Sequence, residues 1–397
     1  MTAQPRARLR VMYPAALFPG GSERQMLLLA RHLPADRFGV SFVVLGENTP
    51  LADEARRLGA TVHVLGSPRR AGTPTTLFAA RVSRRVLAFV ALCRRERFDI
   101  ADAWLFMGYG LVGVTRPLTR IPSFVSGRRS LSRFKERFGP AERVVDAIAR
   151  RSSDAIVANS EAVRRDVARR EGISEDRIRV IRNGVELPAP TTPASIAAAR
   201  ATLGLPLEGL IVGTVGMLKA GKGQDRVVRA FAASGAAADG GLLVLVGEGP
   251  ERPALEALVA SLGLSGRVRL VGLVEDARAL YPAFDVVVSA SSAEGLPNAV
   301  LEAAASGLAI VATDAGGTRE VITDGDSGRL VGVDDDDALA AALRQLVRDP
   351  QARRMLGAAA RQRAARDYGV DRFAAETAAL YEELARAKGR VPDGVTR

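Results

Sequence analysis

Two lysines mark the first segment whose residue types could do chemistry. The chain holds 52 Arg but only four Lys, and residues 218–223 place Lys219 and Lys222 beside two glycines. A compact ammonium on a glycine loop suits a diphosphate, because it acts as a point charge on an oxyanion. The spacing is not that of a Walker A loop, and no Ser or Thr follows the second lysine. We therefore predict phosphate binding here; a solvated surface loop is the alternative.

A second segment, residues 289–302, combines two carboxylates with the start of a predicted helix. Glu294 lies in the loop, and Asn298 and Glu302 share one helix face because they are four residues apart. Backbone N–H groups of the loop can meet a phosphate; the loop residues are Gly295, Leu296, Pro297 and Asn298. Carboxylates beside a phosphate would repel it, so we predict that they accept hydrogen bonds from sugar hydroxyls. A capped surface helix is the alternative.

Glycine turns of a similar kind stand at other predicted strand-to-helix junctions. Glycines allow a close backbone approach, and a helix N-terminus offers N–H groups to an anion. Any one of these turns also fits an ordinary tight turn, but several on one sheet edge favour a binding edge. The residues are Gly20 and Gly21, then Gly247, Glu248 and Gly249, and finally Gly316 and Gly317.

The elements that must position these loops alternate between short apolar runs and longer amphipathic segments. Runs such as residues 242–246 are apolar without alternation, which is typical of parallel strands covered by helices on both faces. We predict strands at residues 9–13, 40–45, 61–65, 100–105, 123–126, 155–159, 210–217, 242–246, 268–271, 286–289 and 309–312. We predict helices at residues 22–33, 51–58, 76–97, 141–151, 161–170, 224–233, 254–262, 298–305, 338–347, 353–366 and 370–388.

Repeated strand–helix units imply right-handed crossovers and an α/β fold. A proline-rich segment at residues 188–193 interrupts the pattern midway and is interpreted as a linker. We predict two doubly wound, Rossmann-like domains facing a cleft, at residues 1–188 and 195–370. Ligands of such sheets bind beyond the carboxyl ends of the strands. The strand-to-helix loops are therefore where chemistry is expected.

Composition narrows the class of protein. A length of 397 residues predicts two or three domains, and a single cysteine, Cys93, cannot form an internal disulfide. No apolar run is long enough to span a bilayer, and residues 1–10 are too short and polar for a signal peptide. We expect a cytoplasmic protein. An acidic run at residues 334–337 precedes a predicted helix, where acids cap the helix, so no metal site is predicted.

The net charge of +12 is unevenly distributed. Residues 1–190 hold 33 Lys+Arg against 18 Asp+Glu, whereas residues 191–397 hold 23 against 26. Cations are interleaved with aromatic side chains at residues 127–138, and the predicted helix at residues 76–97 adds six arginines. Such a surface fits anionic lipid headgroups or a phosphate-linked acceptor. No nucleic-acid recognition motif accompanies the charge. A solvated basic surface is the alternative.

The order of these motifs resembles glycosyltransferase family 4. The resemblance rests on the turn at Gly20, residues 181–185 with Asn183, Lys222, residues 247–250, the pair Glu294 and Glu302, and residues 316–320. It covers nearly the whole chain and is strongest at residues 210–331. The family has the GT-B fold and transfers a sugar from a nucleotide diphosphate sugar with retention of configuration.

The resemblance implies roles for residues of the second domain, which would hold the donor. Lys222 and the Gly20–Gly21 loop would neutralise the diphosphate, Glu302 would bind the ribose, and Glu294 would contact the transferred sugar. Residues 295–298 would hold the sugar and phosphates. Residues 247–249 and the segment from Val271 to Leu273 would lie near the base. No metal or other cofactor would be required.

The first domain would bind a sugar or lipid-linked acceptor, and residues 371–397 would carry a helix back to that domain. Two departures from the family stand out. Met217 occupies a usual Arg position, for which Lys219 could substitute, and no His follows residues 100–105. His32 and His63 are interpreted as structural. The candidate sugar or acceptor pocket therefore consists of Asp102, Trp104, Arg128 and Asn183.

The function predicted is a metal-independent, retaining glycosyltransferase for polysaccharide, glycolipid or cell-envelope glycoconjugate synthesis, cytoplasmic or peripheral at the inner membrane face. One alternative is an epimerase or hydrolase of sugar nucleotides with the same fold. Another is a non-catalytic protein that binds sugar nucleotides. A nicotinamide-dependent dehydrogenase is disfavoured, because no Gly-x-Gly-x-x-Gly fingerprint follows the first strand.

Overall fold

The computed structural model describes residues 8–18, 20–66, 75–274 and 276–390. The chain forms two compact units: unit 1 consists of Met1–Gly184 with Val370–Arg397, and unit 2 consists of Val185–Gly369. The proline-rich segment at residues 188–193 lies inside unit 2, where it leads into a helix that begins at Pro193. Residues 1–7 lie outside the described part.

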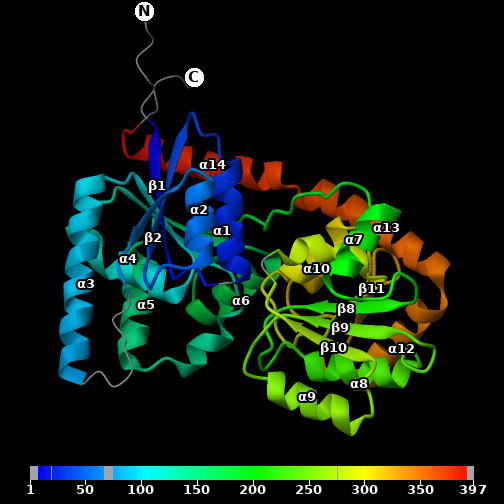
Figure 1. Cartoon of the computed structure of the whole chain (residues 1–397). Coiled ribbons are helices and arrows are strands. Elements are labelled where there is room, and N and C mark those ends of the chain that lie inside the picture. Colours follow the sequence, from blue (N-terminus) through cyan, green and yellow to red (C-terminus); the bar gives the residue numbers. More distant parts are fainter. Residues whose placement is uncertain (1–7, 19, 67–74, 275, 391–397) are drawn as a thin grey trace, which may run out of the picture. The chain divides into compact units, whose positions relative to one another are not determined.

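Unit 1 is built on a parallel sheet of seven strands in the order β3-β2-β1-β4-β5-β6-β7 (Figure 1). The strands are β1 (Leu9–Ala15), β2 (Phe38–Val44), β3 (Thr61–Val64), β4 (Ile100–Ala103), β5 (Ser123–Arg128), β6 (Ala155–Ala158) and β7 (Ile178–Val180). The helices are α1 (Gly21–His32), α2 (Pro50–Arg57), α3 (Thr75–Glu96), α4 (Phe106–Thr119), α5 (Pro140–Ser152), α6 (Glu161–Glu171) and α14 (Val370–Ala387), with 3-10 turns at Ser132–Arg137 and Glu175–Arg177.

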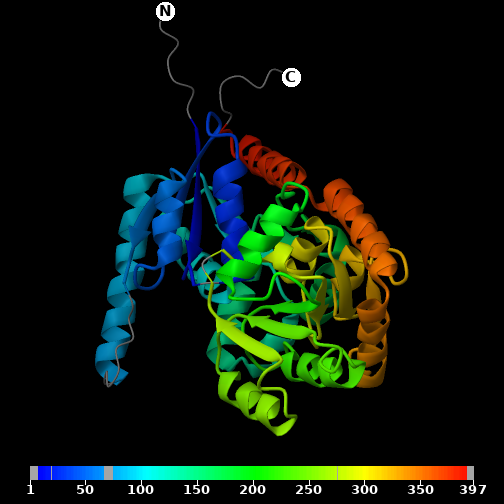
Figure 2. The same cartoon turned by 45° about the vertical axis from the view of Figure 1, so that its right-hand side comes forward.

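Helices cover both faces of this sheet. One face packs Val11 and Tyr13 of β1 against α1, α2 and α14, and the other packs Met12 against α3, α4 and α5. This alternation along β1 is the period of two expected of a strand buried on both sides. The last helix, α14, lies beside α1 and places Phe373 and Tyr381 in the core of unit 1 (Figures 1 and 2).

Unit 2 repeats the plan with six parallel strands in the order β10-β9-β8-β11-β12-β13. The strands are β8 (Ile211–Val215), β9 (Leu242–Val246), β10 (Val268–Gly272), β11 (Val286–Ser289), β12 (Ala309–Thr313) and β13 (Arg329–Val331). The helices are α7 (Pro193–Thr202), α8 (Gln224–Ser234), α9 (Arg252–Ser261), α10 (Asn298–Ala305), α11 (Thr318–Val321), α12 (Asp336–Arg348) and α13 (Pro350–Tyr368), with a 3-10 segment at Ala277–Ala283.

The all-apolar strand β9 shows why both faces of this second sheet are covered. Leu243 and Leu245 pack toward α8, α9 and α12, whereas Val244 and Val246 pack toward α7, α10 and α13. The predicted pair of doubly wound α/β sheets is confirmed. Five elements have no range among those predicted from the sequence: α4, α7, α11, β7 and β13.

Candidate active site

The strand order of unit 2 has one switch point, between β8 and β11, where the chain leaves adjacent strands in opposite directions. The loops after these two strands meet. Ser292 N donates to Gly221 O at 2.9 Å. Gly223 has φ +68°, and a Cβ there would lie 2.1 Å from Ala290 O. Only glycine fits that position, so the two loops are held together by their backbones.

The lysine and the glutamate singled out from the sequence meet at this switch point. Lys222 Nζ lies 2.6 Å from Glu294 Oε1, with side-chain exposures of 29% and 14%. The third loop of the same edge also touches Glu294, because Gly317 N donates to its carbonyl oxygen at 3.3 Å. The structure therefore holds a cation and a carboxylate, which can each contact a ligand, in one half-buried ion pair.

Met217, which stands at the usual Arg position of the family, and Lys219, its predicted substitute, are both exposed. Met217 is 45% exposed, and its carbonyl oxygen accepts a hydrogen bond from Gln224 Nε2 at 3.0 Å. Lys219 is also exposed. A lysine is thus available on this loop near Met217, although no contact in the structure assigns it the role of the missing Arg.

Helix α10 begins at Asn298, and its cap residue is Pro297, which makes no side-chain capping bond. Helix α8 likewise follows Gly223 without a side-chain cap. The side chains of Thr192, Asp335 and Asp349 cap α7, α12 and α13, whereas α9 and α11 also lack a side-chain cap. Both helix N-termini at the switch point therefore present their positive ends without a side-chain cap, which is the arrangement that binds anions. Gly295 and Leu296 are buried in the preceding loop.

Glu302 lies one turn further along α10. Its Oε2 accepts a hydrogen bond from the Tyr281 hydroxyl at 3.0 Å, and the same hydroxyl donates to Ala299 O at 3.1 Å. Burial and the neighbouring Glu302 carboxylate raise the pKa of Tyr281 well above its usual value, so this hydroxyl stays protonated. Tyr281 fixes the Glu302 side chain; it is a residue that sequence reasoning did not find.

The residues assigned to the base come together at the ends of β9 and β10. Gly247 N donates to Gly272 O at 2.9 Å, which places Gly247 beside the segment from Val271 to Leu273. Leu273 is 65% exposed. A Cβ on Gly249 would lie 2.2 Å from Leu218 O, so this turn packs directly on the lysine loop.

Glu248 is exposed and already pairs with Arg252 at 3.0 Å. The acidic run predicted as a helix start does cap a helix, because Asp335 Oδ1 accepts from Ala338 N at 2.9 Å. Within the described ranges, no group of three or more His, Cys, Asp or Glu side chains is arranged to hold a metal ion.

In unit 1, Gly20 is the cap residue of α1 and Gly21 is its first residue. Glu23, two residues on, is a buried carboxylate whose Oε2 would lie 2.7 Å from a Cβ on Gly20. Burial raises the pKa of Glu23, and its own backbone N–H opposes that shift only in part. The sequence analysis assigned no role to Glu23. The contribution of Gly20 and Gly21 to a diphosphate stays a prediction.

Asp102 and Trp104 form a buried network with the last helix. Asp102 Oδ1 accepts from Trp104 Nε1 at 2.7 Å, and Oδ2 accepts from the Tyr381 hydroxyl at 2.6 Å. The Tyr13 hydroxyl lies 2.7 Å from that of Tyr381. Burial raises the pKa of Asp102, whereas Tyr381, Arg129 and Trp104 act in the opposite direction. Asp102 thus positions the Trp104 ring; both of its oxygens are already used within the protein.

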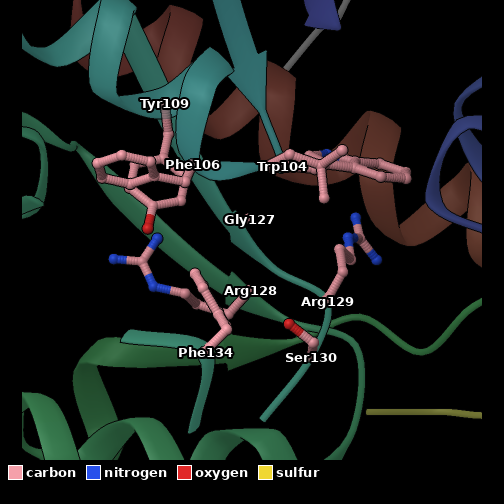
Figure 3. A pocket seen from close by; sticks show the side chains of 9 residues that line it. Trp104, Phe106, Tyr109, Gly127, Arg128, Arg129, Ser130 and Phe134 are labelled. Atoms are coloured by element: carbon pink, nitrogen blue, oxygen red, sulfur yellow. The ribbon is translucent and has the colours of Figure 1, made fainter. Parts of the chain in front are cut away.

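Trp104 lines a cavity of about 230 Å³ at the carboxyl ends of β4 and β5, together with Phe106, Tyr109, Arg128, Arg129 and Phe134 (Figure 3). Arg128 and Arg129 extend to opposite sides of this opening, toward Tyr109 and Trp104 respectively. Successive residues of an extended strand alternate sides. Arg129, which the sequence analysis did not select, is therefore as much part of the cavity as Arg128.

Asn183 is buried beside this cavity, because its Oδ1 accepts from Arg129 Nη1 at 3.3 Å. The structure thus brings Asp102, Trp104, Arg128 and Asn183 into one region of unit 1. His63, by contrast, lies in the edge strand β3 against Phe98, with ring centroids 6.3 Å apart. His32 lies in the last turn of α1.

Two glycosyltransferase family models match this chain. Residues 19–188 match Glycosyltransferase Family 4, and residues 195–363 match Glycosyl transferases group 1. The chain belongs to glycosyltransferase family 4, and it is a transferase of glycosyl groups (EC 2.4).

Curated relatives agree with this assignment. The lipopolysaccharide core biosynthesis glycosyltransferase LpsE of Rhizobium meliloti is 34% identical over 67% of this chain and 70% of its own length. A D-inositol 3-phosphate glycosyltransferase of Corynebacterium urealyticum is 34% identical over 59% of this chain and 57% of its own length.

Solved structures share the fold at lower identity. HepE of Anabaena, crystallised with UDP and glucose, has a TM-score of 0.80 at 22% identity, over 94% of this chain and 99% of its own. Sucrose-phosphate synthase of Thermosynechococcus elongatus has a TM-score of 0.78 at 23% identity, over 96% of this chain and all of its own. These neighbours support the predicted GT-B fold.

Proposed function

We propose that the chain transfers a sugar from a nucleotide diphosphate sugar to an acceptor hydroxyl, with retention of configuration and without a metal ion. The product would belong to a polysaccharide, a glycolipid or another cell-envelope glycoconjugate. The observation that carries the proposal is the Lys222–Glu294 pair at the switch point of unit 2, where three glycine turns and two helix N-termini without side-chain caps converge.

In this proposal the donor's diphosphate takes the place of Glu294 as the partner of Lys222. The ammonium and the N-termini of α8 and α10 stabilise the negative charge that develops on the leaving diphosphate. Glu294, once released, accepts hydrogen bonds from the transferred sugar. Glu302, which Tyr281 holds in position, accepts them from the ribose. The UDP and UDP-glucose held by a structural neighbour make a uridine donor the first to test.

The first test is thermal shift with UDP-, GDP- and ADP-sugars, followed by product analysis with and without an acceptor. We expect one nucleotide series to stabilise the protein, and Lys222→Met to abolish that shift. A variant of the exposed Lys388 serves as the charge control. Full transfer by both Lys222→Ala and Glu294→Ala variants would contradict the site. Epimerised or hydrolysed donor without an acceptor product would favour the alternative reactions.

We propose further that unit 1 rests on an anionic membrane surface from the cytoplasmic side. Neighbouring helices α4 and α5 carry exposed apolar side chains, Met107, Leu118 and Val144 at 63%, 50% and 59%, and α5 adds exposed arginines such as Arg143 and Arg151. Apolar side chains beside cations suit a lipid interface. Among the described residues, no helix is both long and apolar enough to span a bilayer.

Vesicle co-sedimentation tests this location. Binding is expected to vesicles that contain phosphatidylglycerol and to be weaker with phosphatidylcholine alone. The Met107→Ser, Leu118→Ser double variant should lower it. Met355→Ser, at a methionine of unit 2 that is 64% exposed, is the control for a general loss of surface hydrophobicity. Equal binding by the double variant and by wild type would exclude this surface.

A further inference from the structure

The two adjacent arginines of the unit 1 cavity have different electrostatic environments. Arg128 forms an ion pair with Glu171 at 3.1 Å, stacks on Tyr109, and belongs to a cluster in which Lys135 pairs with Asp146 and Glu171. Two cations and two carboxylates balance each other there. Arg128 is almost fully buried within this cluster, so its charge is already neutralised by the protein.

Arg129 has no such partner among the residues that the structure describes. Its guanidinium stacks on Trp104, with 3.4 Å between Cζ and the ring centroid. Its single hydrogen bond to the protein is the long one to Asn183, and its Nε is buried without an acceptor. The nearby Asp102 uses both carboxylate oxygens on Trp104 and Tyr381. Burial lowers the pKa of Arg129 to about 10, so the side chain is still a cation at neutral pH.

Burying the Arg129 guanidinium while some of its N–H groups lack an acceptor costs free energy, unless a ligand supplies the acceptor. The guanidinium fork matches the two oxygens of a phosphate or a carboxylate. Beside it lies a cavity walled by the rings of Trp104, Phe106 and Phe134. Flat apolar walls with one convergent charged group are typical of a small-molecule pocket. The aromatic faces suit the carbon face of a sugar ring.

We infer that this cavity is an acceptor subsite in which Arg129, and not Arg128, binds an oxyanion carried by a sugar ring. The acceptor is therefore an anionic sugar, either a glycosyl phosphate or a uronate. Asp102 and Tyr381 are positioning residues, because they hold the Trp104 ring against which Arg129 is stacked. The inference rests on the proposed glycosyl transfer and specifies its acceptor class.

Ligand-detected NMR and calorimetry on the full chain test this inference, with glucose 1-phosphate, glucuronate and methyl glucoside as probes. Saturating nucleoside diphosphate is present throughout, so that the phosphate probe cannot occupy the donor loops. We expect at least one anionic probe to bind about 10-fold or more tightly than methyl glucoside, which corresponds to about 1.4 kcal/mol. The anion that binds identifies the source of the oxyanion.

Arg129→Gln should remove this preference, and Arg129→Lys should restore part of it, because the charge returns without the fork. Arg165→Gln, at an exposed arginine of α6, is the matched control and should keep the preference. Continued protection of the buried Cys93 from a thiol reagent shows that unit 1 of Arg129→Gln is folded. The inference is overturned if methyl glucoside binds as tightly as both anions, if neither anion binds, or if Arg129→Gln retains the preference. If wild type binds no nucleoside diphosphate, it is the proposed function that fails.

Discussion

Replacing Glu294 by Gln should tighten the binding of a nucleoside diphosphate even though it impairs transfer. Glu294 lies 2.6 Å from Lys222, so a diphosphate must compete with it for the same ammonium. A diphosphate on the far side of Lys222 would stand roughly 6 Å from the carboxylate, a like-charge repulsion of about 0.7–3 kcal/mol for dielectric constants from about 80 to 20. The isosteric amide keeps the shape and removes that repulsion.

Lys222→Met should have the opposite effect and weaken the binding of a nucleoside diphosphate. It removes an opposite charge about 4 Å from the diphosphate, a loss of about 1–4 kcal/mol over the same dielectric range. We therefore expect isothermal titration to show about 3- to 150-fold tighter binding for Glu294→Gln and about 5-fold or more weaker binding for Lys222→Met. Glu208→Gln, at an exposed carboxylate of unit 2, controls for the change in net charge.

Salt separates this electrostatic explanation from a change in shape. Both differences should shrink as ionic strength rises, because the pair is not fully shielded from solvent. The reasoning is refuted if Glu294→Gln weakens diphosphate binding as much as Lys222→Met does. In that case Glu294 would orient the lysine productively and would not compete with the ligand.

Four further outcomes follow from particular contacts. Tyr381→Phe removes a 2.6 Å hydrogen bond to the buried Asp102 and should lower the free energy of unfolding by about 1–3 kcal/mol in urea titrations; an unchanged value would mean that the network contributes nothing. Gly223→Ala should destabilise far more than Gly263→Ala, because both have φ +68° but only Gly223 would place a Cβ 2.1 Å from another backbone atom; equal losses would exclude the steric explanation. Burial raises the pKa of Glu171, but Arg128 and Lys135 outweigh burial and hold the pKa of the folded state below 4.5. The ionised carboxylate therefore stabilises the fold above that pH, and this stabilisation is lost as the pH falls through the folded-state pKa. Glu171→Gln should flatten the pH dependence of the free energy of unfolding between about pH 5 and 3, and an unaltered slope would contradict this. Burial raises the pKa of Cys93 to about 12, so a thiol reagent at mild alkaline pH should react only when unit 1 unfolds; rapid labelling of the folded protein would show that the thiol is accessible.

The elements that sequence reasoning missed show where local patterns are insufficient. Helix α4 contains Gly108, Gly110, Gly113 and Pro117, which locally favour a loop. In the folded unit, a Cβ on Gly108 would lie 2.4 Å from Pro14 O, and one on Gly113 would lie 2.4 Å from Ala149 Cα. These glycines are therefore needed for close packing on β1 and α5, which are distant in sequence and cannot be predicted from the helix alone.

The candidate site likewise contains one part that local sequence patterns predicted and one part that depends on contacts between residues distant in sequence. Glycine, lysine and glutamate spacing predicted the loops of unit 2, because each loop is one short segment placed by one strand end. The cavity of unit 1 depends on Tyr381, which is 279 residues from Asp102, and no local pattern encodes that distance. Arg129 did have a local signal. It follows Arg128 at the end of a strand, where the side chains of neighbouring residues point to opposite sides. Only one of the two arginines can therefore join the cluster with Glu171, and the other must point to the opposite side.

The two ends of unit 2 meet each other. Val185 N donates to Tyr368 O at 2.8 Å, and Val185 forms a parallel bridge with Gly369. Unit 2 is thus an insertion in the amino-acid sequence of unit 1, and its first and last residues are neighbours. On the ribosome, the segment 1–184 must wait for α14 before Asp102 and Tyr13 have their partner, whereas unit 2 can complete its sheet as soon as residue 369 emerges. The unit that starts second is therefore able to finish first.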